Sequence, residues 1–365
     1  MNFSGYIIPF LYFSASHFFI VPLQVNFLVR GQGTMKSIEI IDKDEAVRRM
    51  NQWGKQHKPF FFLVSYDEKQ SIVCPPDELP ENELRFNFNG ITNVVSEMTG
   101  ENEQIEWVPF PESYAQYRKS FEIVRRNLLL GNSFLLNLTC CTPVQTNLSL
   151  QEIYFRSRAK YRLLWKGHFV MFSPEIFVQI ENGEIKTYPM KGTVEADKPD
   201  ACRLLMEDEK EAAEHATITD LLRNDLSRIA DHVHVKRYRY IDRLSTHKGT
   251  LLQTSSEISG NLPADFYEHL GDDFFSLLPA GSVTGAPKKK TVDIIREAEG
   301  YDRGFYTGVT GYFDGENLDS AVIIRFVEEG PDGKLYFKSG GGITFRSDCR
   351  KEYEEMIEKI YVPIY

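Results

Sequence analysis

Hydrophobic side chains recur at helical spacing in several stretches of the chain. In the stretch 114–130, Tyr117, Phe121 and Val124 fall on one face, and Gly131 follows as a residue typical of helix ends. This pattern predicts an amphipathic helix that buries its aromatic face. The same reasoning predicts further helices over 44–55, 206–228, 287–298 and 350–360.

Short apolar runs between these helices are typical of β-strands. The runs 176–180 and 185–188 are separated by a turn at Asn182-Gly183, a pair that favours a tight β-hairpin, so the strands around it should be antiparallel. Strands that alternate with single long helices predict an α+β fold with large antiparallel sheets. The remaining strands are expected at 37–41, 60–65, 134–141, 169–172, 308–313, 320–326 and 335–340.

Charge and cysteine content narrow the class of protein. The 365 residues include 52 acidic and 42 basic side chains, a formal charge of −10 that repels nucleic acids and anionic membrane surfaces. An anionic ligand would therefore need positive charge supplied by its own site. The five cysteines form an odd set without a C-x-x-C pair, which favours neither a disulfide framework nor a zinc site and indicates a reducing cytoplasm.

The first part of the chain differs from the rest. No Lys, Arg, Asp or Glu occurs over 1–29, and the basic residues that begin a secretory signal are missing. Ordinary charge patterning begins at Lys36, so we expect Met35 to be the functional start and 1–34 to be a non-native upstream extension. The chain should then comprise a divergent N-terminal part of the fold over 35–110 and a catalytic domain over 111–365.

Acidic side chains gather on two of the predicted helices. Glu207, Glu211 and Glu214 are spaced at i, i+4 and i+7, which places three carboxylates on one face. Such a stripe is either a solvated acidic face or the wall of a cation site. Glu352 and Glu355 form a second acidic pair in the closing helix, and two helices that each offer a carboxylate could hold Mg²⁺.

Two glycine-rich segments are expected to form turns near a ligand. The segment 281–288, GSVTGAPK, precedes a predicted helix whose free backbone amides favour an anion, and the segment 339–343, SGGGI, lets the backbone approach a ligand closely. Arg325 ends an apolar strand, where its planar guanidinium suits bidentate binding of a carboxylate. An ordinary salt bridge at the strand end is the alternative for that arginine.

One lysine stands in an unusual setting. Lys191 lies between the apolar Met190 and a glycine, where a strand runs into a turn, and Glu175 lies on a neighbouring antiparallel segment. A carboxyl group and an amine on adjacent strands could face one pocket as acid and nucleophile. A solvent-exposed lysine is the alternative interpretation.

In this order along the chain, these segments resemble the chorismate-utilising enzymes, a family that includes the component I chains of anthranilate and aminodeoxychorismate synthases and the isochorismate and salicylate synthases. The resemblance implies an α+β fold in which antiparallel sheets form a sandwich of two subdomains, with helices outside and the active site in the cleft between. It covers roughly 114–361 and is carried by SPEIF, PMKGT, KEAAEH, DLLRNDLSR, GSVTGAPK, GFYTGVTGYF, DSAVIIRF, SGGGI and EYEEMIEK.

The resemblance also implies roles for single residues. Glu214 and Glu355 match the magnesium ligands, with Glu211 and Glu352 beside them, so Mg²⁺ is the implied cofactor. Glu175 matches the general acid that helps the C4 hydroxyl of chorismate to leave. The groups implied to hold the substrate are Thr193, Thr284, Tyr306, Arg325, Gly340, Gly342 and Lys359.

Three positions bear on which reaction the resemblance implies. Family members that form isochorismate or salicylate carry a water-activating lysine where this chain has Leu135, and anthranilate synthases carry alanine where it has Lys191. The sequence P-I-K-G-T is typical of aminodeoxychorismate synthases, whose lysine attacks C2 of chorismate before ammonia enters at C4. Gln253 replaces a family histidine, so the chain lacks a group that titrates near neutral pH at that position.

The implied activity is therefore the conversion of chorismate and ammonia to 4-amino-4-deoxychorismate, for the synthesis of 4-aminobenzoate and folate. The chain contains no glutaminase block of the G-x-C-x-G type, so the ammonia should come from a separate glutamine amidotransferase. Two alternatives stay open: component I of anthranilate synthase, and a catalytically inactive relative that binds chorismate.

Overall fold

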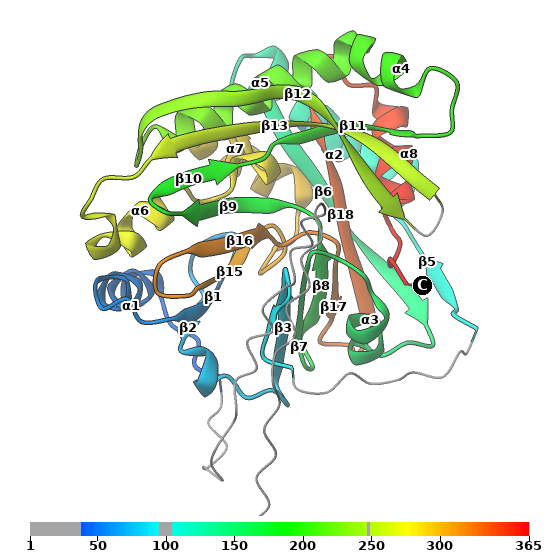
Figure 1. Cartoon of the computed structure of the whole chain (residues 1–365). Coiled ribbons are helices and arrows are strands. Elements are labelled where there is room, and N and C mark those ends of the chain that lie inside the picture. Colours follow the sequence, from blue (N-terminus) through cyan, green and yellow to red (C-terminus); the bar gives the residue numbers. More distant parts are fainter. Residues whose placement is uncertain (1–37, 95–103, 247–248, 365) are drawn as a thin grey trace, which may run out of the picture.

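The computed structural model describes residues 38–94, 104–246 and 249–364, and it contains two nine-stranded sheets, named here sheet A and sheet B (Figure 1). Every strand pair in both sheets is antiparallel, which confirms the predicted α+β fold with large antiparallel sheets. The proposed upstream extension over 1–34 lies outside the described residues.

Strands from distant parts of the chain share each sheet. Sheet A consists of β1 (Phe60–Val64), β2 (Ser71–Cys74), β9 (Ile176–Glu181), β10 (Glu184–Thr187), β11 (Met190–Glu195), β12 (Asp231–Thr246), β13 (Gly249–Asn261), β15 (Val309–Phe313) and β16 (Leu318–Val322). Sheet B consists of β3 (Leu84–Phe88), β4 (Ile91–Thr92), β5 (Trp107–Pro109), β6 (Leu135–Thr146), β7 (Tyr161–Trp165), β8 (Phe169–Ser173), β14 (Gly285–Ala286), β17 (Phe326–Glu329) and β18 (Leu335–Ile343). Residues on both sides of position 110 therefore build both sheets.

Helices cover the outer faces of the two sheets, in agreement with the prediction. The helices are α1 (Lys43–Lys55), α2 (Tyr114–Leu129), α3 (Leu150–Arg156), α4 (Ala201–Glu207), α5 (Glu209–Leu226), α6 (Leu270–Ser276), α7 (Lys288–Glu299) and α8 (Cys349–Glu358), with short 3₁₀ turns η1 (Pro76–Glu78), η2 (Phe266–Glu268) and η3 (Gly281–Val283). Among the described residues, none of these helices is both long and apolar enough to cross a bilayer.

Strand β1 shows why a fully apolar sequence is needed in this sandwich. Successive side chains of a strand point to opposite faces of the sheet. Phe61 and Leu63 pack in the core between the two sheets, whereas Phe60 and Phe62 pack in the core between sheet A and its helices. Both faces of the strand are buried, so the run FFFLV carries no polar residue.

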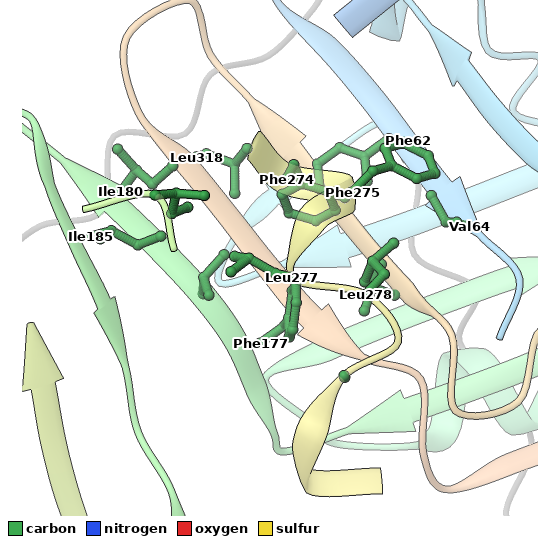
Figure 2. Close-up of a cluster of buried hydrophobic side chains, with 14 of the residues drawn as sticks. Phe62, Val64, Phe177, Ile180, Ile185, Phe274, Phe275, Leu277, Leu278 and Leu318 are labelled. Carbon is green, nitrogen blue, oxygen red and sulfur yellow. The ribbon is translucent and has the colours of Figure 1, made fainter. Parts of the chain in front are cut away.

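The core on the outer face of sheet A is shown in Figure 2, where aromatic and aliphatic side chains of the sheet and of the α6 region gather. Phe274 of α6 meets Phe62 with ring centroids 4.9 Å apart and nearly perpendicular ring planes, and it meets Phe177 at 5.5 Å. These contacts fix the segment that leads from α6 into η3 against the sheet.

Sheet B is covered by α2, α3, α7 and α8. The predicted face of α2 is buried as expected, with Tyr117, Phe121 and Val124 in one core with Ile294 of α7 and Met356 of α8. The Ser113 side chain caps the start of this helix by accepting a hydrogen bond from a backbone amide. Gly131, the glycine that was predicted to end the helix, follows it with a left-handed φ of 73°, so local periodicity and a C-terminal glycine were sufficient to predict α2.

Two sequence-based assignments on sheet A's side need correction. The predicted helix 206–228 is two helices, because Asp208 leaves the helical conformation and its carboxylate accepts a hydrogen bond from the amide of Glu211 at the start of α5. Glu207 therefore ends α4 and is not on one face with Glu211 and Glu214. Of the predicted strand at 37–41, the structure describes 38–41, and these residues contribute only an isolated bridge at Ile41.

Candidate active site

Glu175 and Arg325 lie at two neighbouring places where the chain passes from one sheet to the other. One passage joins β8 of sheet B to β9 of sheet A, and the other joins β16 of sheet A to β17 of sheet B. The amide of Val322 donates to the carbonyl of Glu175, and the amide of Phe172 donates to the carbonyl of Arg325, both at 3.1 Å. The predicted single strand 320–326 is wrong, because it is interrupted at this passage, where Arg325 has a left-handed φ of 54°.

A cavity of about 280 Å³ lies at these passages, lined by both sheets together with η3 and α8. Its volume is near the lower end of the range of about 300–1,000 Å³ found for small-molecule sites. A cleft at the junction of the two sheets is what the sequence led us to expect. The predicted site residues that line it are Glu175, Lys191, Thr193, Tyr306, Arg325, Gly340, Gly342, Glu355 and Lys359.

Lys191 is presented to the cavity by a bulge in β11. The register of β11 against β13 shifts between Lys191 and Thr193, and Gly192 between them has a φ of 68°, which glycine adopts without strain. The Lys191 side chain is 24% exposed, and its Nζ lies 3.3 Å from Oε2 of Glu214 on α5. The lysine is thus a half-buried pocket residue in an ion pair and not a solvated surface residue.

The glycines of 339–343 leave space beside this lysine. The segment was predicted to turn, but it continues β18 as a regular strand paired with β6. A Cβ placed on Gly342 would lie 3.1 Å from Nζ of Lys191, and one on Gly341 would lie 3.7 Å from Oε2 of Glu352. The prediction of a turn was wrong, because the glycines continue a paired strand, in which Gly342 leaves the space beside Lys191 free of a side chain.

Lysines neutralise the carboxylates that were expected to hold magnesium. Nζ of Lys210 lies 3.5 Å from Oε1 of Glu214 and 3.4 Å from Oε1 of Glu352, and Nζ of Lys359 lies 2.7 Å from Oε1 of Glu355. In the part of the chain that the structure describes, no three acidic, histidine or cysteine side chains are grouped closely enough to hold a metal ion. Ammonium groups stand between the carboxylates.

The donor set nevertheless fits a hard divalent cation. Within the described structure, Oε1 of Glu214 is buried and accepts no hydrogen bond, its nearest cation being the Lys210 ammonium at 3.5 Å. Burial, then repulsion by Glu214, raises the pKa of Glu211, and burial together with repulsion by Glu355 and Glu214 raises the pKa of Glu352. Mg²⁺ binds carboxylate oxygens, and a divalent cation would relieve the repulsion between the glutamates of α5 and α8. The residues that would hold it are Glu214, Glu355 and Glu352, with Glu211 beside them.

Glu175 has the environment of a proton donor. Burial raises the pKa of its carboxyl group, while a hydrogen bond from Ser282 and the charges of Lys191 and Lys359 oppose that rise. The hydroxyl of Ser282 donates to Oε1 of Glu175 at 2.5 Å. A carboxyl group held in this way could be protonated when substrate arrives and could release its proton to a leaving group.

Arg325 and Lys359 add positive charge to the lining of the cavity. A guanidinium nitrogen of Arg325 donates to the carbonyl of Lys359 at 3.0 Å, and the guanidinium lies over the ring of Tyr361 at 4.9 Å. Nζ of Lys359 donates to the carbonyl of Gly340 at 2.9 Å. These contacts hold two cations at the cavity, and an anionic ligand needs such charges in a protein of net charge −10.

The structure and the sequence disagree on some site residues. Thr284, expected to bind substrate, is completely buried and is not among the residues that line the cavity. Gln253, which replaces the family histidine, does line the cavity and lies opposite Thr193 in the β11–β13 pair. Ser282 and Asn137 also line the cavity, but the sequence analysis assigned them no role. Ser282 could have been predicted as a site residue, because it carries a hydroxyl group within the segment GSVTGAPK.

Comparison with known proteins places this geometry in a family. The chain is 47% identical over 318 residues to an "Uncharacterized PabA-like protein" of Pasteurella multocida, covering 87% of this chain and 98% of that protein. It is 36% identical over 245 residues to anthranilate synthase component 1 of Acetivibrio thermocellus, covering 63% and 48% of the two chains. It is 35% identical over 207 residues to aminodeoxychorismate synthase component 1 of Salmonella typhimurium, covering 54% and 44%.

A solved structure shares the fold. The menaquinone-specific isochorismate synthase MenF from Escherichia coli superimposes with a TM-score of 0.68 at 18% identity, over 88% of this chain and 82% of that one. The model of the chorismate binding enzyme family matches residues 89–364, which include both sheet passages and the whole cavity lining. With its sandwich, its cleft and this match, the chain belongs to the family of chorismate binding enzymes.

Proposed function

We propose that this chain is the component I of an aminodeoxychorismate synthase, which converts chorismate and ammonia to 4-amino-4-deoxychorismate. The observation that carries the proposal is the position of Lys191, a lysine at the cavity where anthranilate synthases have alanine. Its Nζ is near the glycine strand β18 on one side and Glu214 on the other. An amine so placed can act as a nucleophile toward a bound substrate.

Two residues divide the first chemical step. Nζ of Lys191 attacks C2 of chorismate, the ring double bonds shift, and the C4–O bond breaks as Glu175 gives its proton to the departing hydroxyl, which leaves as water. Ammonia then forms the new bond at C4, the double bonds shift back, and the C2–N bond to Lys191 breaks. Arg325 and Lys359 would hold the carboxylates of the substrate during both steps.

Lys191 must be neutral to attack, and its ion pair with Glu214 bears directly on that requirement. Mg²⁺ held by Glu214, Glu355 and Glu352 would neutralise the carboxylates and help to bind a carboxylate of the substrate. If Glu214 bound a divalent cation, Lys191 would lose its counter-ion. The proposed metal requirement and the proposed nucleophile therefore involve the same glutamate.

Leu135 supports amination over hydration. A Cβ on Gly342 would lie 3.3 Å from Cδ1 of Leu135 and 3.1 Å from Nζ of Lys191, so the leucine borders the same space as the lysine. An aliphatic side chain cannot remove a proton from water. This position argues against the formation of isochorismate or salicylate.

Anthranilate synthesis is the second candidate, because the anthranilate synthase relative matches a longer part of the chain at similar identity. The lysine at position 191 separates the two candidates, since direct attack of ammonia at C2 would not use it. A catalytically inactive relative is not favoured, because Glu175, Lys191 and Glu355 all line the cavity.

The deciding experiment is product identification. Purified chain is incubated with chorismate, Mg²⁺ and ammonium at alkaline pH, and products are separated by liquid chromatography and mass spectrometry with and without an added aminodeoxychorismate lyase. The proposal predicts a product that the lyase converts to 4-aminobenzoate. Anthranilate as the main product would support the second candidate, and unconsumed chorismate would support an inactive relative.

A further inference from the structure

Ser282 has no role in the activity proposed so far, yet it makes a short contact with the proposed general acid. It lies in η3, and its Oγ donates to Oε1 of Glu175 at 2.5 Å. Both residues line the cavity. The two side chains come from separate elements, since Glu175 lies at the passage from β8 to β9.

Buried ion pairs anchor the loop that carries this serine. A guanidinium nitrogen of Arg303 donates to the carbonyl of Val283 at 2.8 Å, and Arg303 is itself paired with Glu299 at 2.6 Å, with side-chain exposures of only 2% and 1%. Before η3 in the chain, the carbonyl of Leu277 accepts a hydrogen bond at 2.6 Å from Nζ of Lys288, which lies 2.8 Å from Oδ2 of Asp225. The two pairs thus hold the backbone on both sides of Ser282, and the hydrogen bond to Glu175 orients its hydroxyl.

The direction of the hydrogen bond decides which oxygen of Glu175 can carry a proton. A protonated carboxyl group has one O–H donor and one carbonyl oxygen that accepts. Since Oε1 accepts from Ser282, the proton of the acid form belongs on Oε2. A general acid works only when its proton-bearing oxygen meets the leaving group at hydrogen-bond distance.

We propose that Ser282 is a positioning residue that holds Oε1 of Glu175, so that Oε2 is the oxygen that delivers the proton to the leaving hydroxyl of the substrate. The inference rests on the proposed role of Glu175, but it applies to either amination reaction, since the C4 hydroxyl leaves in both. The hydrogen bond to Glu175 thus gives a role to the serine of the segment GSVTGAPK.

The variants Ser282→Ala and Ser282→Thr test this role in the full chain, with Ser276→Ala as a control that removes a hydroxyl remote from the cavity. Consumption of chorismate is measured for each protein as a function of pH, with Mg²⁺ and a fixed concentration of free ammonia. None of the variants changes a charged group that lines the cavity with Glu175, namely Lys191, Lys359, Arg325, Lys338 and Glu355.

Ser282→Ala should lower kcat by about 10²-fold, the smaller end of the effect of general acid catalysis, with little change in KM. Because the serine hydrogen bond lowers the pKa of Glu175, its loss should raise that pKa and move the loss of activity at alkaline pH to a higher pH. Ser282→Thr retains the donor and should restore both kcat and the pH profile, and Ser276→Ala should match the wild type.

Melting curves accompany each assay, and Ser282→Cys, which keeps the size of the side chain with a weak donor, replaces any alanine variant that fails to fold. A serine-free variant with an unchanged kcat and pH profile would refute the inference, as would a shift of the alkaline limb to lower pH, which would make the serine an acceptor. If wild type consumes chorismate but forms no aminodeoxychorismate, the proposed function fails while the inference stands. If wild type consumes no chorismate, both fail.

Discussion

Nζ of Lys191 and Oε2 of Glu214 lie 3.3 Å apart, so the proposed nucleophile and a proposed metal ligand form one ion pair. An ammonium group cannot attack a carbon atom. A carboxylate that pairs with an ammonium group favours the protonated form of the amine. A change that separates Glu214 from Lys191 should therefore affect both metal binding and catalysis.

Replacing Lys191 by alanine should abolish the covalent route. We expect Lys191→Ala to form aminodeoxychorismate at least about 10²-fold more slowly, the order of loss that follows removal of a catalytic group. Any residual product should arise from direct attack of ammonia, including addition at C2 that leads to anthranilate. Incubation of wild type with chorismate without ammonia, followed by mass spectrometry of the Lys191 peptide, should reveal the adduct. Equal rates of aminodeoxychorismate formation in the two proteins would exclude the nucleophile.

Binding of a divalent cation should depend on Glu214 and not on Glu207. Mn²⁺ serves as a spectroscopic substitute for Mg²⁺, and its binding can be followed by electron paramagnetic resonance without any substrate. Glu214→Gln should weaken binding by at least about tenfold, since it removes one charged ligand. Glu207→Gln is the matched control, because Glu207 belongs to the same predicted stripe but ends α4 with a side chain that is 67% exposed. Equal weakening in both variants would contradict the site.

Lys210 should compete with the metal ion, because its Nζ stands between Glu214 and Glu352. Its side chain is 42% exposed, so it can withdraw into solvent. We expect Lys210→Gln to tighten Mn²⁺ binding by about tenfold, since like charges about 4 Å apart repel by roughly 1–4 kcal/mol at effective dielectric constants of about 80–20. Lys198→Gln removes a charge of an exposed surface pair and should leave the affinity unchanged. Weaker binding by Lys210→Gln would show that the lysine supports the site.

Two glutamates of α7 should differ sharply in their effect on stability. Glu299 and Arg303 form a buried pair, and removing one partner of such a pair costs about 3–5 kcal/mol of unfolding free energy. Glu297 and Arg126 form an exposed pair at 3.0 Å, with side-chain exposures of 53% and 63%, whose loss costs less than about 1 kcal/mol. Denaturant unfolding of Glu299→Ala and Glu297→Ala measures both values. Similar losses in the two variants would contradict the structural role of the buried pair.

Local signals predicted much of the fold. The amphipathic face of α2 and the hairpin between β9 and β10 were predicted because each depends on residues close in sequence, and Asn182 and Gly183 have the positive φ angles of 53° and 76° that the turn requires. The long strands β12 and β13 were missed. In the sequence of β12, DHVHVKRYRYIDRLST, the alternation of apolar and polar residues is broken between Val235 and Tyr238, where the register against β13 also shifts. Its pairing with β13 over 11 matched positions is a tertiary property that the hydrophobic pattern does not express.

The site was predictable in its residue types and less so in its contacts. Contiguous motifs were sufficient to select Glu175, Lys191 and Glu355, which line the cavity, whereas the predicted Glu211, Glu214 and Glu352 are not among its lining residues. The pair of Lys191 with Glu214 and the pair of Lys210 with Glu352 join different elements, so no single motif encodes them. The pairs Lys210–Glu214 and Lys359–Glu355 are spaced at i, i+4 within one helix and could have been predicted from the sequence.

The chain passes between the two sheets five times, and these passages, which include those that carry Glu175 and Arg325, also determine how the protein can unfold. Along the chain, β1–β2 belong to sheet A, β3–β8 to sheet B, β9–β13 to sheet A, β14 to sheet B, β15–β16 to sheet A and β17–β18 to sheet B. No contiguous fragment contains all strands of one sheet without strands of the other, so neither sheet is an autonomous folding unit. Loss of one sheet would expose the hydrophobic core that it shares with the other sheet. Unfolding should therefore be a single cooperative transition in which the cleft is lost together with both sheets.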